Sequence, residues 1–295
     1  MQQVQIIQNE KKEKLSISSI MDKLKLPIKA IEIAILIFII IIFIFPFIWM
    51  ISTSLKTTQE AIQIPPSIIP SKFVTENYIQ AWNSGPFFRY LVNSIFITLS
   101  ILLIQFVVMV PAAYAFSKMK FKGSNILFGI VLIGLMVPSQ ITFLPVYMMM
   151  SKAELINTYV PLILPFMTSS FGIFLLRQNF MQISDEIIES AKLDNTSDFK
   201  IMFKIMLPMA KPAVITFALF SFIYHWNNYF WPLVMSNSDL VRTLPIGISM
   251  LKESEGVTNW NIVMAGNVML TAPILLLYTI LNNKIKNAFA YSGIK

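Results

Sequence analysis

The stretch IAILIFIIIIFIF, residues 33–45, consists almost entirely of Ile, Leu and Phe. It belongs to a charge-free window that continues to Leu55, and a lysine-rich segment precedes it. A helix needs roughly 20 apolar residues to cross the hydrocarbon core of a bilayer. The run is too long for the apolar part of a signal peptide, and no small-residue cleavage site follows it. The sequence therefore predicts an uncleaved helix that spans a membrane.

Further windows without Asp, Glu, Lys or Arg follow, each long enough to cross a bilayer. They cover residues 90–117, 123–151, 155–176, 212–238 and 256–283. Buried charge is costly at the bilayer centre, so such windows are typical of membrane spans. Of all residues 56% are hydrophobic and 13% are charged, which makes six buried helices of a soluble protein a weak alternative. The predicted fold is an all-α integral membrane protein with six transmembrane helices.

Most of the 23 Lys and Arg residues fall on one side of these spans. They lie in the segment before residue 30, in the second-to-third and fourth-to-fifth connections, and after the sixth span, and include Lys118, Lys120, Lys122, Arg177, Lys192, Lys200, Lys204, Lys211, Lys284 and Lys286. Positive residues stay in the cytoplasm, so both termini are predicted to be cytoplasmic. The net charge of +8 is then a topology signal and gives no reason to expect a nucleic-acid partner.

This topology predicts three parts. A cytoplasmic tail covers residues 1–29, a six-helix transmembrane domain covers 30–287, and a second cytoplasmic tail covers 288–295. Within the transmembrane domain the core is expected at about 90–285, with a long cytoplasmic loop at 178–210.

The predicted spans contain no Asp or Glu, although transporters coupled to protons or sodium usually carry ionisable or cation-binding groups there. No Gly-Lys pair occurs, so the loop that cradles nucleotide phosphates is missing. If ATP drives transport, another polypeptide must bind it. The chain has no cysteine, and no metal site or catalytic residue is predicted. A carrier or channel that acts alone remains the alternative.

The single histidine, His225, lies in the fifth window. It is either a structural residue, a substrate or gate contact, or a proton relay. Several windows also contain proline, which favours a kink. These residues are Pro111, Pro138, Pro145, Pro161, Pro165 and Pro273. The kinks indicate either helices that line a path or ordinary packing.

The connection at 178–210 is long for a compact protein, which is typical of a functional loop. Its pattern predicts two short helices, Ser184–Leu193 with Ser184 as the N-cap, and Ser197–Met206. The second helix is expected to pack one apolar face, formed by Phe199, Met202, Phe203 and Met206. Asp194-Asn195-Thr196 between them predicts a turn. The alternative is an amphipathic loop on the membrane surface.

Within this connection, Glu189-Ser190-Ala191-Lys192-Leu193-Asp194-Asn195, followed by Ile205-Met206-Leu207-Pro208, resembles the cytoplasmic signature of binding-protein-dependent ABC importer permeases. The family pattern has Ala at 190 and Gly at 195. Asn is among the best tolerated non-Gly residues in a left-handed conformation, so Asn195 keeps that turn feasible. Further stretches resemble the carbohydrate branch, including Ala112-Ala113-Tyr114-Ala115-Phe116, Trp226-Asn227-Asn228-Tyr229-Phe230-Trp231 and Thr243-Leu244-Pro245-Ile246-Gly247.

The resemblance implies a type I ABC importer transmembrane domain in a bacterial cell membrane. It also implies partners: a second homologous permease, two ABC ATPase subunits and an extracytoplasmic substrate-binding protein. ATP and magnesium would be bound by the ATPases, and this chain would bind no cofactor. The loops at 52–89 and 236–260 would face the binding protein. The residues expected to couple to the ATPase are Glu189, Ser190, Ala191, Asp194, Asn195, Leu207 and Pro208.

A polar and aromatic cluster in the fifth window is the candidate substrate path. It contains Trp226, Asn227, Asn228, Tyr229 and Trp231. Indole rings stack on sugar faces and the amides can hydrogen-bond hydroxyls. The alternative is an interfacial aromatic belt or structural packing. The sequence leaves malto-oligosaccharides, other oligosaccharides, monosaccharides and glycerol phosphate open as substrates.

Overall fold

The computed structural model describes residue 29, residues 31–252 and residues 258–292. Nearly all of the predicted N-terminal tail, and residues 293–295 of the C-terminal one, lie outside the described residues. No β-strand occurs in the described part of the chain. After a first helix at Ile31–Ser54, the helices are α2 (Thr58–Ile62), α3 (Glu76–Asn83), α4 (Phe87–Lys118), α5 (Ser124–Met136), α6 (Ser139–Lys152), α7 (Val160–Ile163), the 3₁₀ helix η1 (Leu164–Phe166), α8 (Ser170–Met181), α9 (Asp185–Leu193), α10 (Asp198–Lys200), the π-helix η2 (Ile201–Met206), α11 (Leu207–Met209), α12 (Lys211–Trp226), α13 (Phe230–Met235), α14 (Leu244–Met250) and α15 (Trp260–Ser292).

Four of the described helical stretches are long and apolar enough to cross a membrane, and two bent pairs raise this to as many as six. The long stretches, Ile31–Ser54, Phe87–Lys118, Val160–Met181 and Trp260–Asn282, match the first, second, fourth and sixth predicted windows. The helix α15 runs to Ser292, so it extends past the apolar stretch that ends at Asn282 and into the segment predicted as the C-terminal tail.

The third predicted window does not form one straight helix. Its two halves, α5 and α6, meet at 97°, and Pro138 is the N-cap of α6. Proline lacks the N–H that would continue the hydrogen bonding of α5, which accounts for the break. The fifth window is divided into α12 and α13 by the non-helical residues 227–229.

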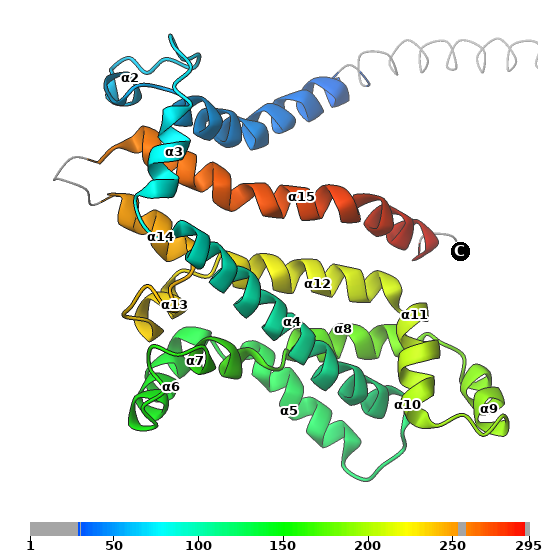
Figure 1. The fold of residues 1–295 in the computed structure, drawn as a ribbon. Helices are drawn as coiled ribbons and strands as arrows, with labels where there is room; N and C mark the ends of the chain where they lie inside the picture. The colour runs from blue at the N-terminus through cyan, green and yellow to red at the C-terminus, as the bar shows by residue number, and fades with distance from the viewer. Residues whose placement is uncertain (1–28, 30, 253–257, 293–295) are drawn as a thin grey trace, which may run out of the picture.

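The long helices run roughly alongside one another (Figure 1). The helix α4 packs along both α8 and α12, and α12 packs against α15. Figure 1 shows α2, α3, α13 and α14 at one end of the molecule, which we call the outer end. The segment α9–α11 lies at the opposite end, together with the described start of the first helix and the end of α15.

A tightly packed core joins α4, α8 and α12 near Gly172. A Cβ atom at this position would lie 2.1 Å from Met109 Sδ and 2.7 Å from Phe217 Cε2, so only glycine permits this approach. By contrast, the first helix is covered with exposed apolar side chains such as Phe43, which is 71% exposed. Apolar surface of this kind suits a lipid environment.

At the outer end, a buried amide pair joins three elements. Asn77 on α3 donates to the carbonyls of Ser54, the last residue of the first helix (2.8 Å), and of Lys56, just after it (2.9 Å). Asn261 on α15 donates to Asn77 Oδ1 at 2.9 Å. These bonds fix the outer ends of the first helix and α15 against α3.

Candidate functional site

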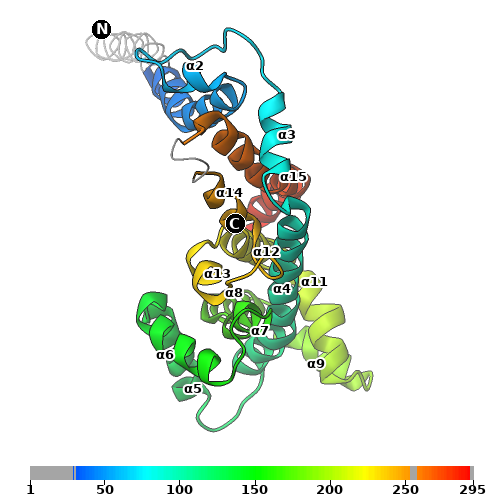
Figure 2. The ribbon, with the colours of Figure 1, turned by 60° about the vertical axis from the view of Figure 1, so that its left-hand side comes forward.

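The connection between α8 and α12 contains the predicted short helices. In α9, the Ser184 hydroxyl accepts a hydrogen bond from the Glu186 N–H at 3.3 Å, so the predicted cap is confirmed. Asn195 has a φ of 54°, which confirms the left-handed turn expected there. The second helical stretch begins at Asp198 as α10 and continues through η2 into α11, beyond the predicted end. Both views show α9 projecting from the rest of the chain (Figures 1 and 2).

The last turns of α4 are tied to the start of α9 and to the start of α10. Lys118 Nζ donates to the Ile183 carbonyl at 2.6 Å and to Asp185 Oδ1 at 2.5 Å. This hydrogen bond and the charge of Lys118 hold the pKa of Asp185 below its ordinary value. Past α9, the Tyr114 hydroxyl donates to Asp198 Oδ1 at 2.9 Å. The helix α4 therefore holds the start of α9 and the start of α10.

Most of the residues predicted to couple to an ATPase are on the surface of this segment. The exposed ones are Glu189, Ser190, Asp194, Asn195 and Pro208, while Leu207 is half-buried. Ala191 differs, because it is only 8% exposed and packs into the core together with Ile188. Its small side chain therefore serves packing within this chain and does not lie open to a partner.

Sequence reasoning missed two exposed apolar side chains here. Leu193 is 84% exposed and Phe199, which was expected on the packed face, is 67% exposed. For Phe199 the cause is the π-helix η2, which lies between Phe199 and the end of the predicted face and whose i→i+5 bonding shifts the register of that face. Of the other residues predicted for this face, Met206 is fully buried and Met202 and Phe203 are half-buried against the core, as expected. Ile201, which was not expected on this face, is fully buried as well. An α-helical periodicity does not reveal this shift.

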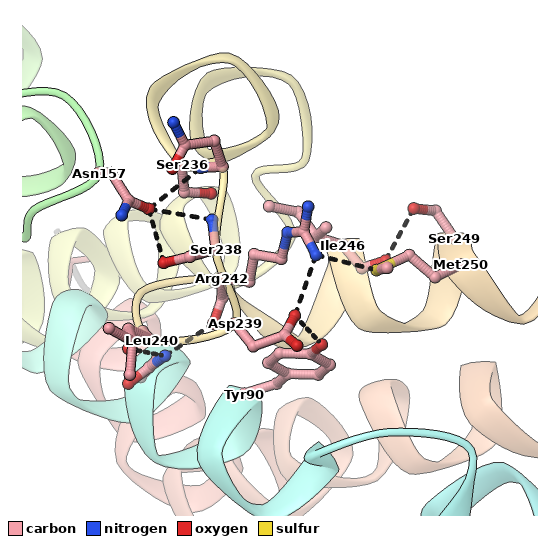
Figure 3. A network of polar contacts seen from close by, with 12 residues as sticks. Tyr90, Asn157, Ser236, Ser238, Asp239, Leu240, Arg242, Ile246, Ser249 and Met250 are labelled. Carbon is pink, nitrogen blue, oxygen red and sulfur yellow. Dashed lines mark hydrogen bonds and ion pairs between the residues drawn. The ribbon is translucent and has the colours of Figure 1, made fainter.

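At its other end, α4 holds the loop that precedes α14 (Figure 3). The Tyr90 hydroxyl donates to Asp239 Oδ1 at 2.6 Å, and Arg242 donates to the same oxygen at 2.9 Å. These two donors, the tyrosine foremost, hold the pKa of Asp239 below its ordinary value. Asn93 donates to the carbonyls of Leu240 and Arg242, at 3.1 and 2.8 Å.

Asn157, in the connection between α6 and α7, also holds this loop. Asn157 Oδ1 accepts hydrogen bonds from the N–H groups of Asn237 (3.1 Å) and Ser238 (3.0 Å) and from the Ser238 hydroxyl (2.9 Å), and Figure 3 shows how these groups converge. Residues 236–243, which we call the outer loop, are therefore held both by α4 and by Asn157.

The candidate substrate residues separate into two groups. Trp226 and Trp231 are buried, and their indole N–H groups donate to the carbonyls of Leu270 (3.0 Å) and Pro161 (2.8 Å). Both rings are thus packing anchors in this structure. Asn228 Oδ1 accepts from the Trp231 N–H at 3.3 Å.

Asn227 and Tyr229 instead line a pocket of about 600 Å³ at the outer end. Arg242 and Lys252 line it as well, so we call it the cationic outer pocket. Among the described residues there is no group of three or more His, Cys, Asp or Glu side chains that could hold a metal ion.

A chain of apolar helices, with a projecting polar segment tied to one end of a long helix and a loop tied to the other, has the organisation of a membrane transport subunit. The sequence model of the "binding-protein-dependent transport system inner membrane component" family matches residues 108–289. This chain therefore belongs to that family, the permeases of ABC importers, and is a multi-pass membrane protein. Membership decides against a carrier or channel that acts alone and against an enzyme embedded in the membrane.

Curated relatives carry related descriptions. The arabinooligosaccharides transport system permease protein AraQ of Halalkalibacterium halodurans is 32% identical over 253 residues, which are 85% of this chain and 90% of AraQ. The sn-glycerol-3-phosphate transport system permease protein UgpE of Pectobacterium atrosepticum is 32% identical over 225 residues, covering 74% of this chain and 80% of UgpE.

Two solved structures share the fold. One is a bacterial ABC transporter involved in the import of the acidic polysaccharide alginate, with a TM-score of 0.77 and 24% identity, covering 87% of this chain and 96% of that one. The other is a bacterial alginate ABC transporter in complex with an alginate pentasaccharide-bound periplasmic protein. Its TM-score is 0.61 and its identity 16%, covering 87% of this chain and 92% of the other.

Proposed function

We propose that this chain is the transmembrane permease subunit of an ATP-driven carbohydrate importer. The observation that carries the proposal is the attachment of the segment α9–α10 to α4 through Lys118–Asp185 and Tyr114–Asp198. A partner that moves α9 from the cytoplasm would move α4, which crosses the whole molecule. The 32 residues of α4 span about 48 Å at a rise of about 1.5 Å per residue.

The proposed assembly pairs this chain with a second homologous permease, two ABC ATPase subunits and an extracytoplasmic substrate-binding protein. ATP and magnesium are bound by the ATPases. The chain lies in a bacterial cell membrane with both termini in the cytoplasm. The clustering of Lys and Arg in the α8–α12 connection supports this orientation.

The proposed docking surface for an ATPase is the exposed part of α9 and the turn after it. Its polar members are Glu189, Ser190, Asp194 and Asn195, and Leu193 supplies an exposed apolar contact among them. Pro208 and Leu207 connect the segment to α12. Binding interfaces commonly place such an apolar anchor within a polar rim.

A carbohydrate cargo is supported by the relatives, one of which is described as transporting arabinooligosaccharides. Of the residues proposed for the path, Asn227 and Tyr229 are open to the cationic outer pocket. Trp226, Asn228 and Trp231 would act on the path by holding α12 and α13 in place.

The test is a charge reversal on α9. Glu189→Lys is expected to abolish ATP-dependent uptake in the complete transporter and to reduce recovery of the ATPase when this chain is purified in mild detergent. Membrane insertion should be unchanged because the side chain is exposed. The matched control is Glu154→Lys, an exposed reversal after α6 on the outer side, which should leave ATPase recovery unchanged. Normal uptake and normal ATPase recovery in Glu189→Lys would overturn the coupling role.

A further inference from the structure

The fourth long helical stretch is interrupted partway along its length. Between η1 and α8, Thr168 and Ser169 are not helical, and the Ser169 hydroxyl accepts from the Gly172 N–H at 3.2 Å to start α8. Beside this break lies a pocket of about 440 Å³ between α4, α8 and α12, which we call the mid-span pocket. Its walls include Gln105, Phe171, Phe217, Phe220, Tyr224 and His225. Transporter sites commonly form near the membrane midplane where helices are broken.

The lining combines aromatic rings with neutral polar groups. Gln105 donates to the Phe166 carbonyl at 2.9 Å and accepts from the Ser221 hydroxyl at 2.6 Å, so the break, α4 and α12 share one hydrogen-bond chain. The side chains of Thr168, Tyr224 and His225 make no hydrogen bond to another described residue and remain able to bind a ligand.

No charged side chain lines the mid-span pocket, in contrast to the cationic outer pocket with Arg242 and Lys252. Rings that stack on the apolar face of a sugar, next to uncharged hydrogen-bonding groups, suit a neutral saccharide. They do not suit a phosphate or a carboxylate, because a charge moved into such surroundings would find no counter-charge.

Toward the outer end, the mid-span pocket is closed by aromatic side chains. The Phe166 ring contacts His225 and Trp231, with ring centroids 5.0 and 5.3 Å apart. On the far side of these residues lies a cavity of only about 10 Å³, which Phe166 and His225 also line. The buried hydroxyls of Thr98 and Thr243 face this cavity without a hydrogen-bond partner. Such a space holds about one water molecule and excludes a sugar.

We propose that the mid-span pocket binds a neutral sugar ring of the transported carbohydrate, with Phe166 and His225 forming the closed barrier on its outer side. This inference rests on the proposed function. It assigns substrate contact to Phe220, Tyr224 and His225 and leaves Trp226 and Trp231 as packing residues.

The test uses the fact that the chain contains no cysteine. In the complete transporter in lipid nanodiscs, single Phe220→Cys and Tyr224→Cys variants are treated with a small methanethiosulfonate reagent, and the mass of this chain reports labelling. The control is Leu103→Cys on α4, which is 67% exposed, compared with 59% for Phe220 and 56% for Tyr224, and does not line the pocket. Arabino-oligosaccharides are the neutral probes and glycerol 3-phosphate is the anionic probe.

Uptake of a neutral probe, together with slower labelling at positions 220 and 224 but not at 103, is the expected result. The slowing should reach about tenfold at a probe concentration about ten times its Kd, because bound sites are shielded in proportion to 1 + [L]/Kd. Uptake of a neutral probe without this protection overturns the inference and leaves the proposed function standing. ATP-driven uptake of glycerol 3-phosphate alone likewise overturns only the inference. If neither probe is taken up, malto-oligosaccharides and monosaccharides replace them in the same assay, and failure of every neutral sugar to be taken up overturns both the carbohydrate assignment and the inference.

Discussion

The hydroxyl of Tyr114, in the last turns of α4, donates a 2.9 Å hydrogen bond to Asp198, the first residue of α10. Tyr114 is 1% exposed, so its hydroxyl reaches the surface segment from within the core. The bond therefore connects the interior of the membrane domain to the segment that follows α9.

Tyr114→Phe should weaken the coupling between ATP hydrolysis and uptake. The substitution keeps the ring and removes one hydrogen bond to a carboxylate, a loss of about 1.5–3 kcal/mol at most. Asp198 is partly exposed, so solvent reduces the cost of losing the bond. The measurement is substrate transported per ATP hydrolysed in proteoliposomes. Tyr278→Phe, at an exposed position on α15, is the control. An unchanged ratio in Tyr114→Phe would remove the role given to this bond.

The contact between Lys118 and Asp185 should respond to acid in a defined range. Because Lys118 lowers the pKa of Asp185 below 3.8, the contact stabilises the folded state above pH 3.8, and this stabilisation is lost as the pH falls through the lower, folded-state pKa. Hydrogen exchange of the α9 amides should therefore remain slow, after correction for intrinsic rates, from neutral pH down to about 3.8. In Asp185→Asn, α9 should exchange faster at neutral pH. Equal protection in both proteins would contradict the prediction.

Asn195 should tolerate Gly but not Ala. At a φ of 54°, a residue with a Cβ but no side-chain polar group is disfavoured by about 1–2 kcal/mol, whereas Gly is not. Asn195→Ala should therefore speed hydrogen exchange in α9 and α10, and Asn195→Gly should not. Matching exchange in the two variants would show that the backbone conformation does not limit this turn.

Gly172→Ala should destabilise the contact between α4, α8 and α12. The added methyl would collide with Met109 and Phe217, and overpacking of this kind costs about 1–3 kcal/mol. The midpoint of thermal unfolding in detergent should fall, and Met109→Ala in the same chain should restore part of the loss. Gly129→Ala is the control, because nothing lies within 4 Å of a Cβ added there. Equal midpoints for the two single variants would contradict the packing argument.

The features that were predicted correctly are those that depend on local sequence. The apolar windows locate the long helices because lipid demands uninterrupted apolar length. Ser184 and Asn195 were placed correctly because capping and left-handed turns depend on a few neighbouring residues.

Features that depend on tertiary contacts were not predicted. The π-helix η2 that exposes Phe199 leaves no trace in an α-helical periodicity. Trp226 and Trp231 looked like sugar-stacking residues, but only the fold shows that neighbouring carbonyls accept from both indoles. Thr168 and Ser169 lie in an apolar window, and the neighbouring sequence does not indicate that α4 and α12 complete a pocket around them.

The anchoring of one helix at both ends has a thermodynamic consequence. Tyr90 and Asn93 hold the outer loop, and Tyr114 and Lys118 hold the α9 segment, all from α4. A shift of α4 as a rigid body displaces both attachments together. Suppose that an ATPase docked on the α9 segment raises the affinity of the outer loop for the substrate-binding protein by some factor. Linkage then requires that the bound substrate-binding protein raise the affinity of the α9 segment for the ATPase by the same factor. Coupling through α4 would therefore run in both directions: binding of the loaded substrate-binding protein outside would strengthen ATPase docking as much as ATPase docking strengthens binding of that protein.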